Sequence, residues 1–172
     1  GLETGMTRLE VGCGWGATMK RAVEIYDVNV SGLTLSENQK TRVERVFAES
    51  DSLRSQRVLL QGWEQFDERV DRIVSIGAFE HFGADRHNDF FKTAYAALPD
   101  DGVMLLHTIT RLTLDELKAA DIPLTMDAAR FASFISKEIF PGGHLPTIEA
   151  VQELASSCGF TVKRTHSLQP HY

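Results

Sequence analysis

A glycine-rich segment near the N-terminus carries the clearest chemical signal in this sequence of 172 residues. Residues 12–16 read Gly-Cys-Gly-Trp-Gly and stand between an apolar run and a segment of helical spacing. Alternate glycines allow a sharp turn and let a ligand lie against the backbone, and exposed amides at a helix start attract negative groups. The spacing differs from the G-x-G-x-x-G of dinucleotide sites. Together with Glu10, two residues before the first glycine, it predicts a loop that binds S-adenosylmethionine (SAM).

Other residues able to do chemistry follow the remaining apolar runs of the sequence. Open α/β sheets bind ligands at the carboxyl ends of their strands, so we expect these side chains to share one edge of a sheet. In chain order they are Thr34, Trp63, Glu64, Glu80, His107 and Tyr172.

Each candidate also has a purely structural interpretation, and the sequence leaves both open. Gln39 either contacts a ribose or completes a capping box with Ser36. Trp63 is either a core aromatic or, as its polar neighbours favour, a half-exposed ring beside an adenine. Glu80 stands where the helix dipole alone would favour an acid. His107 ends an apolar run, where a histidine is often a satisfied core residue.

Metal binding and hydrolase chemistry have no support in the sequence. The other histidines show no paired metal-ligand spacing, and no G-x-S-x-G motif is present. Cys13 and Cys158 do not form a disulfide framework and are interpreted as small packing residues.

Short apolar runs alternate with segments of helical spacing along the chain. This alternation predicts an α/β fold with a doubly wound, mostly parallel sheet, Rossmann-like in arrangement, and the nearly unbroken Val, Ile and Leu runs indicate helices on both faces. The predicted strands are 8–11, 28–33, 57–60, 72–76, 102–109 and 160–168, and the predicted helices are 16–26, 37–49, 81–98 and 147–157.

One stretch, residues 110–146, interrupts the alternation after the fifth strand. It contains two segments of helical spacing, 114–120 and 127–139, and the first opens with a capping box formed by Thr113 and Glu116. An insertion at this point of a doubly wound sheet lies at the carboxyl ends of the strands. It is either a cover for a substrate or a packing insert.

Length and composition predict a single soluble domain spanning residues 1–172. Apolar residues make up 42% and charged residues 24%, which is ordinary for globular proteins. A net charge of −6 without a basic cluster argues against nucleic acid as a partner. The apolar runs are too short to span a bilayer, and no signal peptide opens the chain, so we expect a cytoplasmic location.

The motifs together resemble the mycolic acid cyclopropane synthase family, whose members are SAM-dependent and modify double bonds in very long acyl chains held on an acyl carrier protein. The resemblance covers essentially the whole chain. Relative to the family pattern, we expect a core that lacks the helical segment before the first strand and the tail after the last. The segments that carry the resemblance are EVGCGWG (10–16), GLTLSENQ (32–39), GWEQF (62–66), GAFEHFG (77–83), IFPGG (139–143) and LQPHY (168–172).

The resemblance implies a role for each matching residue. Glu80, His107 and Tyr172 match the residues that hold a catalytic bicarbonate ion, which acts as the base. The first strand and its loop would hold the methionine part of SAM, and the later segments would surround its ribose and adenine. The implied cofactor residues are Arg8, Leu9, Glu10, Val11, Gly12, Cys13, Gly14, Trp15, Gly16, Thr34, Leu35, Ser36, Gln39, Trp63, Glu64 and Ile76.

The family chemistry explains this set of residues. A double bond attacks the sulfonium methyl group and leaves a carbocation, and a base then removes a proton from the new methyl so that a cyclopropane ring closes. Aromatic faces stabilise such a cation, and the candidates are Trp15, Phe79, Phe82 and Phe140. Two other hypotheses remain: methyl transfer to oxygen or nitrogen of a small acceptor, and a SAM-binding module without catalysis.

Overall fold

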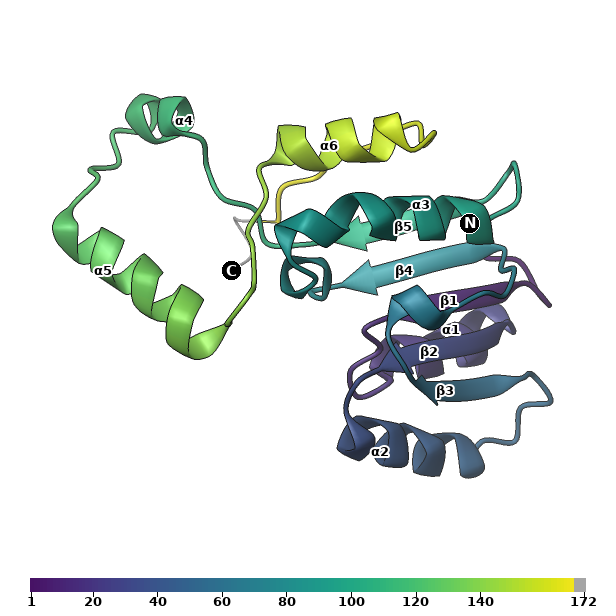
Figure 1. Ribbon diagram of the computed structural model, residues 1–172. Coiled ribbons are helices and arrows are strands. Elements are labelled where there is room, and N and C mark those ends of the chain that lie inside the picture. The colour runs from purple at the N-terminus through teal and green to yellow at the C-terminus, as the bar shows by residue number, and fades with distance from the viewer. Residues whose placement is uncertain (169–172) are drawn as a thin grey trace.

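Five strands form one parallel sheet in the computed structural model, which describes residues 1–168 (Figure 1). The strand order is β3-β2-β1-β4-β5, and every pairing is parallel, so the predicted doubly wound fold is confirmed. The order reverses between β1 and β4, which places the segment after β1 at the switch point where such sheets bind ligands. The strands are β1 (Thr7–Val11), β2 (Asn29–Thr34), β3 (Gln56–Leu60), β4 (Arg72–Ile76) and β5 (Val103–His107).

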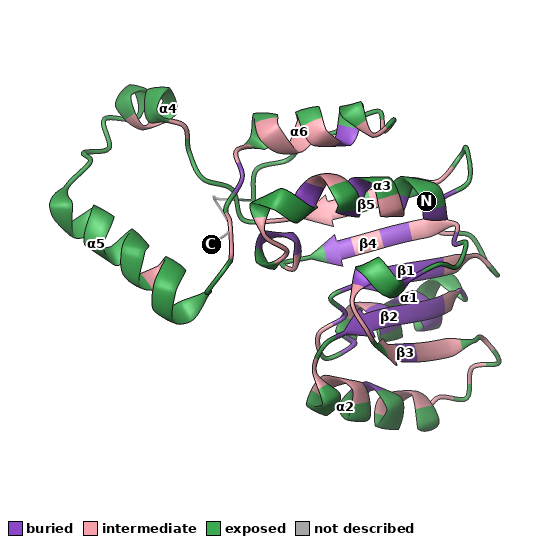
Figure 2. Cartoon of the chain, in the orientation of Figure 1, coloured by how far each residue is buried: buried purple, intermediate pink, exposed green. Residues whose placement is uncertain are grey.

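Helices cover both faces of the sheet, and each face has its own core (Figure 2). On one face α1 (Ala17–Tyr26) and α2 (Glu37–Ala48) bury Met19 and Val43 against Val30 and Val58 of the sheet. On the other face α3 (His87–Ala97) and α6 (Ile148–Ser157) pack with side chains of β1 and β4. The longest apolar run, Val103–Leu106, lies on β5 at an edge of the described sheet, and none of its residues is buried. The central strands β1, β2 and β4 are more buried, although polar residues interrupt their apolar ones.

Gly32 on β2 shows how closely α1 approaches the sheet. A Cβ at this position would lie 2.5 Å from Met19 Sδ and 2.8 Å from Cys13 Cβ. The missing side chain therefore lets α1 and the loop before it rest directly on the strand.

The insertion between β5 and α6 leaves the sheet at the carboxyl ends of the strands (Figure 1). It contains α4 (Leu114–Ala119), α5 (Met126–Phe134) and a π-helical turn, η4 (Ile135–Ile139), where the sequence predicts one helix over 127–139. The capping box of Thr113 and Glu116 is present. None of these three described elements contains a buried residue, and several apolar side chains are exposed. Within residues 1–168, no helix is long and apolar enough to cross a bilayer.

Two further predicted elements differ from the structure. Residues 160–168 do not form a sixth strand. Phe160 packs against Phe91 and Tyr95, with ring centroids 6.0 and 5.2 Å apart, and the Gln152 amide donates to the Thr165 hydroxyl at 3.0 Å. These contacts join the segment to α3 and α6. The predicted helix 81–98 is also shorter, because two 3₁₀ turns, η2 (Phe79–His81) and η3 (Ala84–Arg86), precede α3.

Candidate active site

The glycine loop after β1 combines two glycines needed for packing with one that faces open space. Gly12, Gly14 and Gly16 have φ angles of +76°, +54° and +81°, which are left-handed values that favour glycine. A Cβ on Gly12 would lie 2.5 Å from Ala78 Cβ, and one on Gly16 would lie 2.8 Å from Val43 Cγ1. A Cβ on Gly14 would meet nothing within 4 Å. Gly14 is therefore the point where a ligand can approach the backbone.

Backbone hydrogen bonds hold the loop in shape and reduce the number of amides open to a ligand. The Gly12 and Cys13 amides donate to the Leu33 carbonyl at 3.1 and 2.9 Å, and the Gly16 amide donates to the Cys13 carbonyl at 3.0 Å. The Gly14 and Trp15 amides have no acceptor within residues 1–168. These two N–H groups are the donors that the loop offers to an anionic group such as a carboxylate.

Glu10 is a buried carboxylate that joins β1 to α1. It forms an ion pair with Arg8 and accepts a hydrogen bond from the Thr18 hydroxyl, and only 4% of Glu10 and 5% of Arg8 is exposed. Burial raises the pKa of Glu10, while the Thr18 hydrogen bond and the Arg8 charge oppose that rise. Leu9 and Val11 point into the core. The roles of Arg8, Leu9 and Val11 toward a cofactor stay predictions, and their side chains support the loop from beneath.

The segment after β2 forms a small polar network in which one predicted pairing differs. The Gln39 amide N–H donates to Ser36 Oγ at 3.3 Å, as a capping box requires, but the Gln39 side chain does not return the bond. Its Oε1 instead accepts from the Thr34 hydroxyl at 2.6 Å, and Thr34 Oγ1 accepts from the Ser36 amide at 3.1 Å. The Thr34 hydroxyl therefore contacts the Gln39 side chain directly, a pairing that the sequence pattern does not indicate. Leu35, 82% exposed, stands beside this network.

Trp63 is a core residue, and the expectation of a half-exposed ring is wrong. Only 6% of Trp63 is exposed, and its ring centroid lies 5.7 Å from that of Phe82 and 5.6 Å from that of Phe90. The 3₁₀ turn η1 (Trp63–Gln65) follows β3 and brings the indole onto α3, where aromatic side chains enclose it. A role of Trp63 beside adenine stays a prediction.

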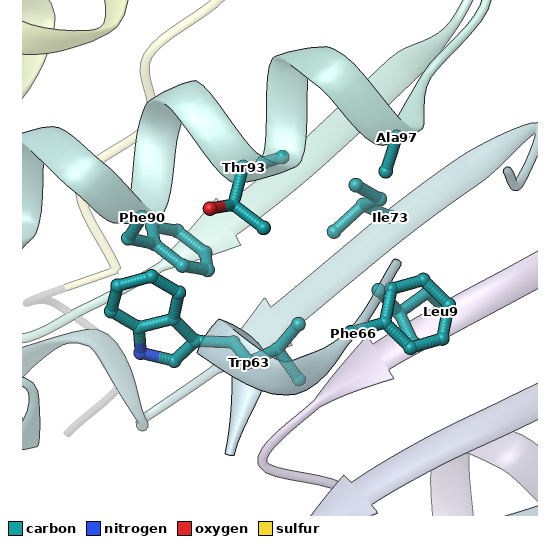
Figure 3. Close-up of a pocket in the computed structure, with 9 residues that line it drawn as sticks. Leu9, Trp63, Phe66, Ile73, Phe90, Thr93 and Ala97 are labelled. Atoms are coloured by element: carbon teal, nitrogen blue, oxygen red, sulfur yellow. The ribbon is translucent and has the colours of Figure 1, made fainter. Parts of the chain in front are cut away.

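A small cavity lies beneath Trp63, between η1, α3 and the sheet (Figure 3). Its volume is about 10 Å³, and its lining includes Leu9, Phe66 and Ile73. This volume is near the lower limit for a single water molecule. The cavity is a packing gap, so it is not the ligand site.

Glu64 carries a charge beside this aromatic group. It forms an ion pair with Arg86 of η3, and the Arg86 guanidinium carbon lies 5.3 Å from the centre of the Trp63 ring. Arg86 therefore stacks on Trp63 and holds Glu64 at the same time. The sequence analysis did not single out Arg86, because the contact joins two turns that are distant along the chain.

The ends of β4 and β5 bring Glu80 and the His107 region together, as the topology predicts. Ile76 and His107 are paired in register, and the Gly77 amide donates to the His107 carbonyl at 3.0 Å. Glu80 on η2 is 6% exposed, and its Oε2 accepts a hydrogen bond from the Thr108 hydroxyl at 3.0 Å. Tyr172, the third predicted member of this group, lies outside the described residues.

The aromatic residues proposed to face a cation differ widely in exposure. Phe79 is fully buried and stacks on His87, with ring centroids 3.9 Å apart, so it belongs to the core. Trp15 and Phe140 are exposed at the ligand edge, and the Phe140 ring centroid lies 5.2 Å from that of His81. These two are the aromatic faces that a substrate can reach.

His87 is a satisfied core histidine. Its Nε2–H donates to the Phe79 carbonyl at 3.1 Å, and burial lowers the pKa of the ring. Across residues 1–168, no group of three or more His, Cys, Asp or Glu side chains is placed to hold a metal ion.

Sequence reasoning missed three polar residues that contact the predicted ones. Thr18 supports Glu10, Arg86 pairs with Glu64, and Thr108 bonds to Glu80. Thr108 was within reach, because it follows His107 at the end of a predicted strand. Thr18 and Arg86 lie at the starts of helical segments, and the sequence carries no spacing signal that links them to their partners.

The sheet order, the helices on both faces and the glycine loop at the switch point define the class of the protein. It has the α/β fold of SAM-dependent methyltransferase structures. The sequence profile of the mycolic acid cyclopropane synthetase family matches residues 1–172, and the chain belongs to this family.

Three relatives from Mycobacterium tuberculosis align with the whole chain. Cyclopropane mycolic acid synthase 1 is 64% identical over 172 residues, cyclopropane mycolic acid synthase MmaA2 is 62% identical and methoxy mycolic acid synthase MmaA3 is 58% identical. The MmaA2 structure matches 99% of the chain with a TM-score of 0.97. The structure of the first relative, complexed with SAH and CTAB, matches 99% of the chain with a TM-score of 0.94. The chain spans about 60% of the length of these relatives.

Proposed function

We propose that this chain carries the SAM site and the catalytic carboxylate of an enzyme that methylates a double bond of a long acyl chain. The observation that carries the proposal is the likeness to a relative whose structure contains SAH and the lipid-like CTAB, at 64% identity over 99% of this chain. The acceptor is a mycolic acid precursor on an acyl carrier protein. The product is a cyclopropane or a methyl-branched or oxygenated chain.

The residues present fit SAM. Gly14 leaves open space above the backbone, and the amides of Gly14 and Trp15, which have no acceptor among the described residues, suit the methionine carboxylate. The polar side chains of Thr34 and Gln39 suit ribose hydroxyl groups, and Glu64 can accept a hydrogen bond from an adenine amino group. When bound, SAM supplies the electrophilic methyl group.

The Glu80 region fits a bicarbonate ion that serves as the base. Bicarbonate carries one hydroxyl that can donate to the Glu80 carboxylate, and its remaining oxygens can accept from an imidazole N–H or a phenol. In this proposal Glu80, His107 and Tyr172 orient the ion, and Glu80 Oε1 is the oxygen that Thr108 leaves open. Placement must be tight, because the proton comes from the newly attached methyl group.

Apolar residues at the ligand edge support an acyl acceptor over a polar one. Leu35, Trp15 and Phe140 are exposed around the loop and the Glu80 turn, and the insertion adds exposed Phe131 and Phe134. Methyl transfer to oxygen or nitrogen would need a polar pocket with a group that deprotonates the acceptor. The insertion, residues 110–146, is the proposed cover of the acyl chain.

Transfer of an isotope-labelled methyl group tests the proposal. The chain is incubated with methyl-labelled SAM, an unsaturated long-chain acyl group on acyl carrier protein, and bicarbonate. The expected result is label on carbon of the acyl chain, with a mass gain of one CH₂ unit or of a methyl group plus hydroxyl. Label on an oxygen or nitrogen acceptor, or no transfer at all, would contradict the proposal.

A further inference from the structure

Segments at both ends of the insertion meet at Glu80. Just before the insertion, the Thr108 hydroxyl donates to Glu80 Oε2 at 3.0 Å, and near its end the His144 amide donates to the Glu80 carbonyl at 2.8 Å. The Arg111 amide donates to the Pro146 carbonyl at 3.0 Å and ties the two ends to each other. The Glu80 turn is therefore held from two sides by segments distant in sequence.

The two contacts on Glu80 do different things. The bond from His144 fixes the backbone of the turn, but it leaves the side-chain torsions of Glu80 free. The bond from Thr108 fixes the carboxylate itself and occupies one of its two oxygens. The alternative acceptor for the Thr108 hydroxyl is the Ile109 carbonyl, which is 3.3 Å away. The shorter distance and the negative charge favour the carboxylate.

We infer that Thr108 is the positioning residue for the Glu80 carboxylate, and this inference rests on the function proposed above. Threonine is stiff about χ1, so its hydroxyl is a well-defined anchor. Because Thr108 follows His107 directly, one stretch of backbone places both the imidazole and the group that orients the carboxylate. Oε1 of Glu80 is thereby left to face the base or the substrate.

Three substitutions distinguish a positioning role of Thr108 toward Glu80 from a general contribution to the stability of the fold. Thr108→Val removes the hydroxyl at nearly constant shape, and Thr108→Ser keeps it. Thr161→Val is the matched control, because Thr161 is exposed, lies outside the insertion and forms no side-chain hydrogen bond within residues 1–168. Thermal unfolding of all three variants checks that each one folds.

The first readout is the ¹³C resonance of the Glu80 side-chain carboxyl, which does not depend on turnover. We expect Thr108→Val to move this signal, Thr108→Ser to restore it and Thr161→Val to leave it in place. The second readout is labelled-methyl transfer: kcat should fall about tenfold or more in Thr108→Val, with the KM for SAM within about twofold of wild type and kcat largely rescued in Thr108→Ser.

The outcomes distinguish this inference from the proposed function. An unmoved Glu80 signal in Thr108→Val, or a kcat within about twofold of the Thr161→Val control, overturns the positioning role while the proposed function stands. A wild-type chain without any methyl transfer overturns the proposed function, and the positioning role falls with it.

Discussion

Arg8 and Glu10 form an ion pair on β1 that is almost completely enclosed by protein. Thr18 at the start of α1 donates a hydrogen bond to the same carboxylate. The carboxylate therefore joins the strand before the glycine loop to the helix after it. The strand before the glycine loop and the helix after it are thereby held together, and Gly14 lies between them.

Replacing Arg8 tests the energetic importance of this pair. Arg8→Met leaves a buried carboxylate without its cation, so we expect the free energy of unfolding to fall by about 3–5 kcal/mol at pH 7. The double variant Arg8→Met/Glu10→Gln should recover much of that loss, because no buried charge remains. Urea unfolding of the four proteins of this cycle gives the coupling between the two residues.

The loss of stability caused by Arg8→Met should depend on pH in a defined direction. Burial raises the pKa of Glu10, so the folded state binds its proton more tightly than the unfolded state. The contribution of this group to stability is then present below the unfolded pKa of about 4.5 and is lost as the pH rises through the folded pKa. Arg8→Met should be less destabilised at pH 5 than at pH 7. A larger loss at pH 5 would contradict this account.

Gly14→Ala separates ligand approach from backbone strain. Both Gly14 and Gly142 have positive φ and open space around a new Cβ, so alanine should cost each of them about 1–2 kcal/mol of stability. Only Gly14 lies in the proposed cofactor loop. We expect Gly14→Ala to weaken SAH binding at least about tenfold and Gly142→Ala to leave it unchanged. Equal effects in calorimetric titrations of the two variants would count against the loop as the cofactor site.

Glu80→Gln should abolish turnover and leave cofactor binding intact. Glutamine keeps an acceptor for the Thr108 hydroxyl but removes the charge that the proposed base requires. We expect methyl transfer to fall by about 10²-fold or more. The control is Glu153→Gln, on the exposed side of α6 and outside the insertion. Turnover of Glu80→Gln at the control rate would refute the role of the carboxylate.

Cys13 should resist alkylation. Burial, together with the negative charge of Glu10, raises the pKa of the Cys13 thiol to about 11, so almost none is thiolate at neutral pH. Cys158 is only partly buried. Iodoacetamide at pH 7 should therefore modify Cys158 first, which peptide mass spectrometry resolves. Modification of Cys13 at a comparable rate would show that the loop opens readily.

The sheet could be predicted because short apolar runs alternate with helical segments along the chain. The run in β5 is an example, although none of its residues is buried. Residues 160–168 were mistaken for a sixth strand, although Phe160 packs against Phe91 and Tyr95 of α3 and Val162 and Leu168 are exposed. Local pattern does not reveal which neighbour a segment will choose.

The sequence predicts which edge of the sheet carries the candidate site, but not the side-chain contacts within that site. Parallel topology brings Glu80 and His107 to neighbouring strand ends, and this followed from the alternation alone. The burial of Trp63 did not follow, because the aromatic residues that enclose it belong to turns and a helix far along the chain. Contacts between side chains that are distant in the sequence, such as Thr108 with Glu80, can be identified only from the three-dimensional structure.

Titration of the chain with SAH tests the central claim most directly, because it examines the SAM site without requiring an acyl substrate. Isothermal calorimetry should give one site per chain with a Kd in the micromolar range, corresponding to a binding free energy of about −8 kcal/mol. The Gly14→Ala variant should bind at least about tenfold more weakly in the same experiment. No detectable binding by the wild-type chain at millimolar SAH would contradict the account.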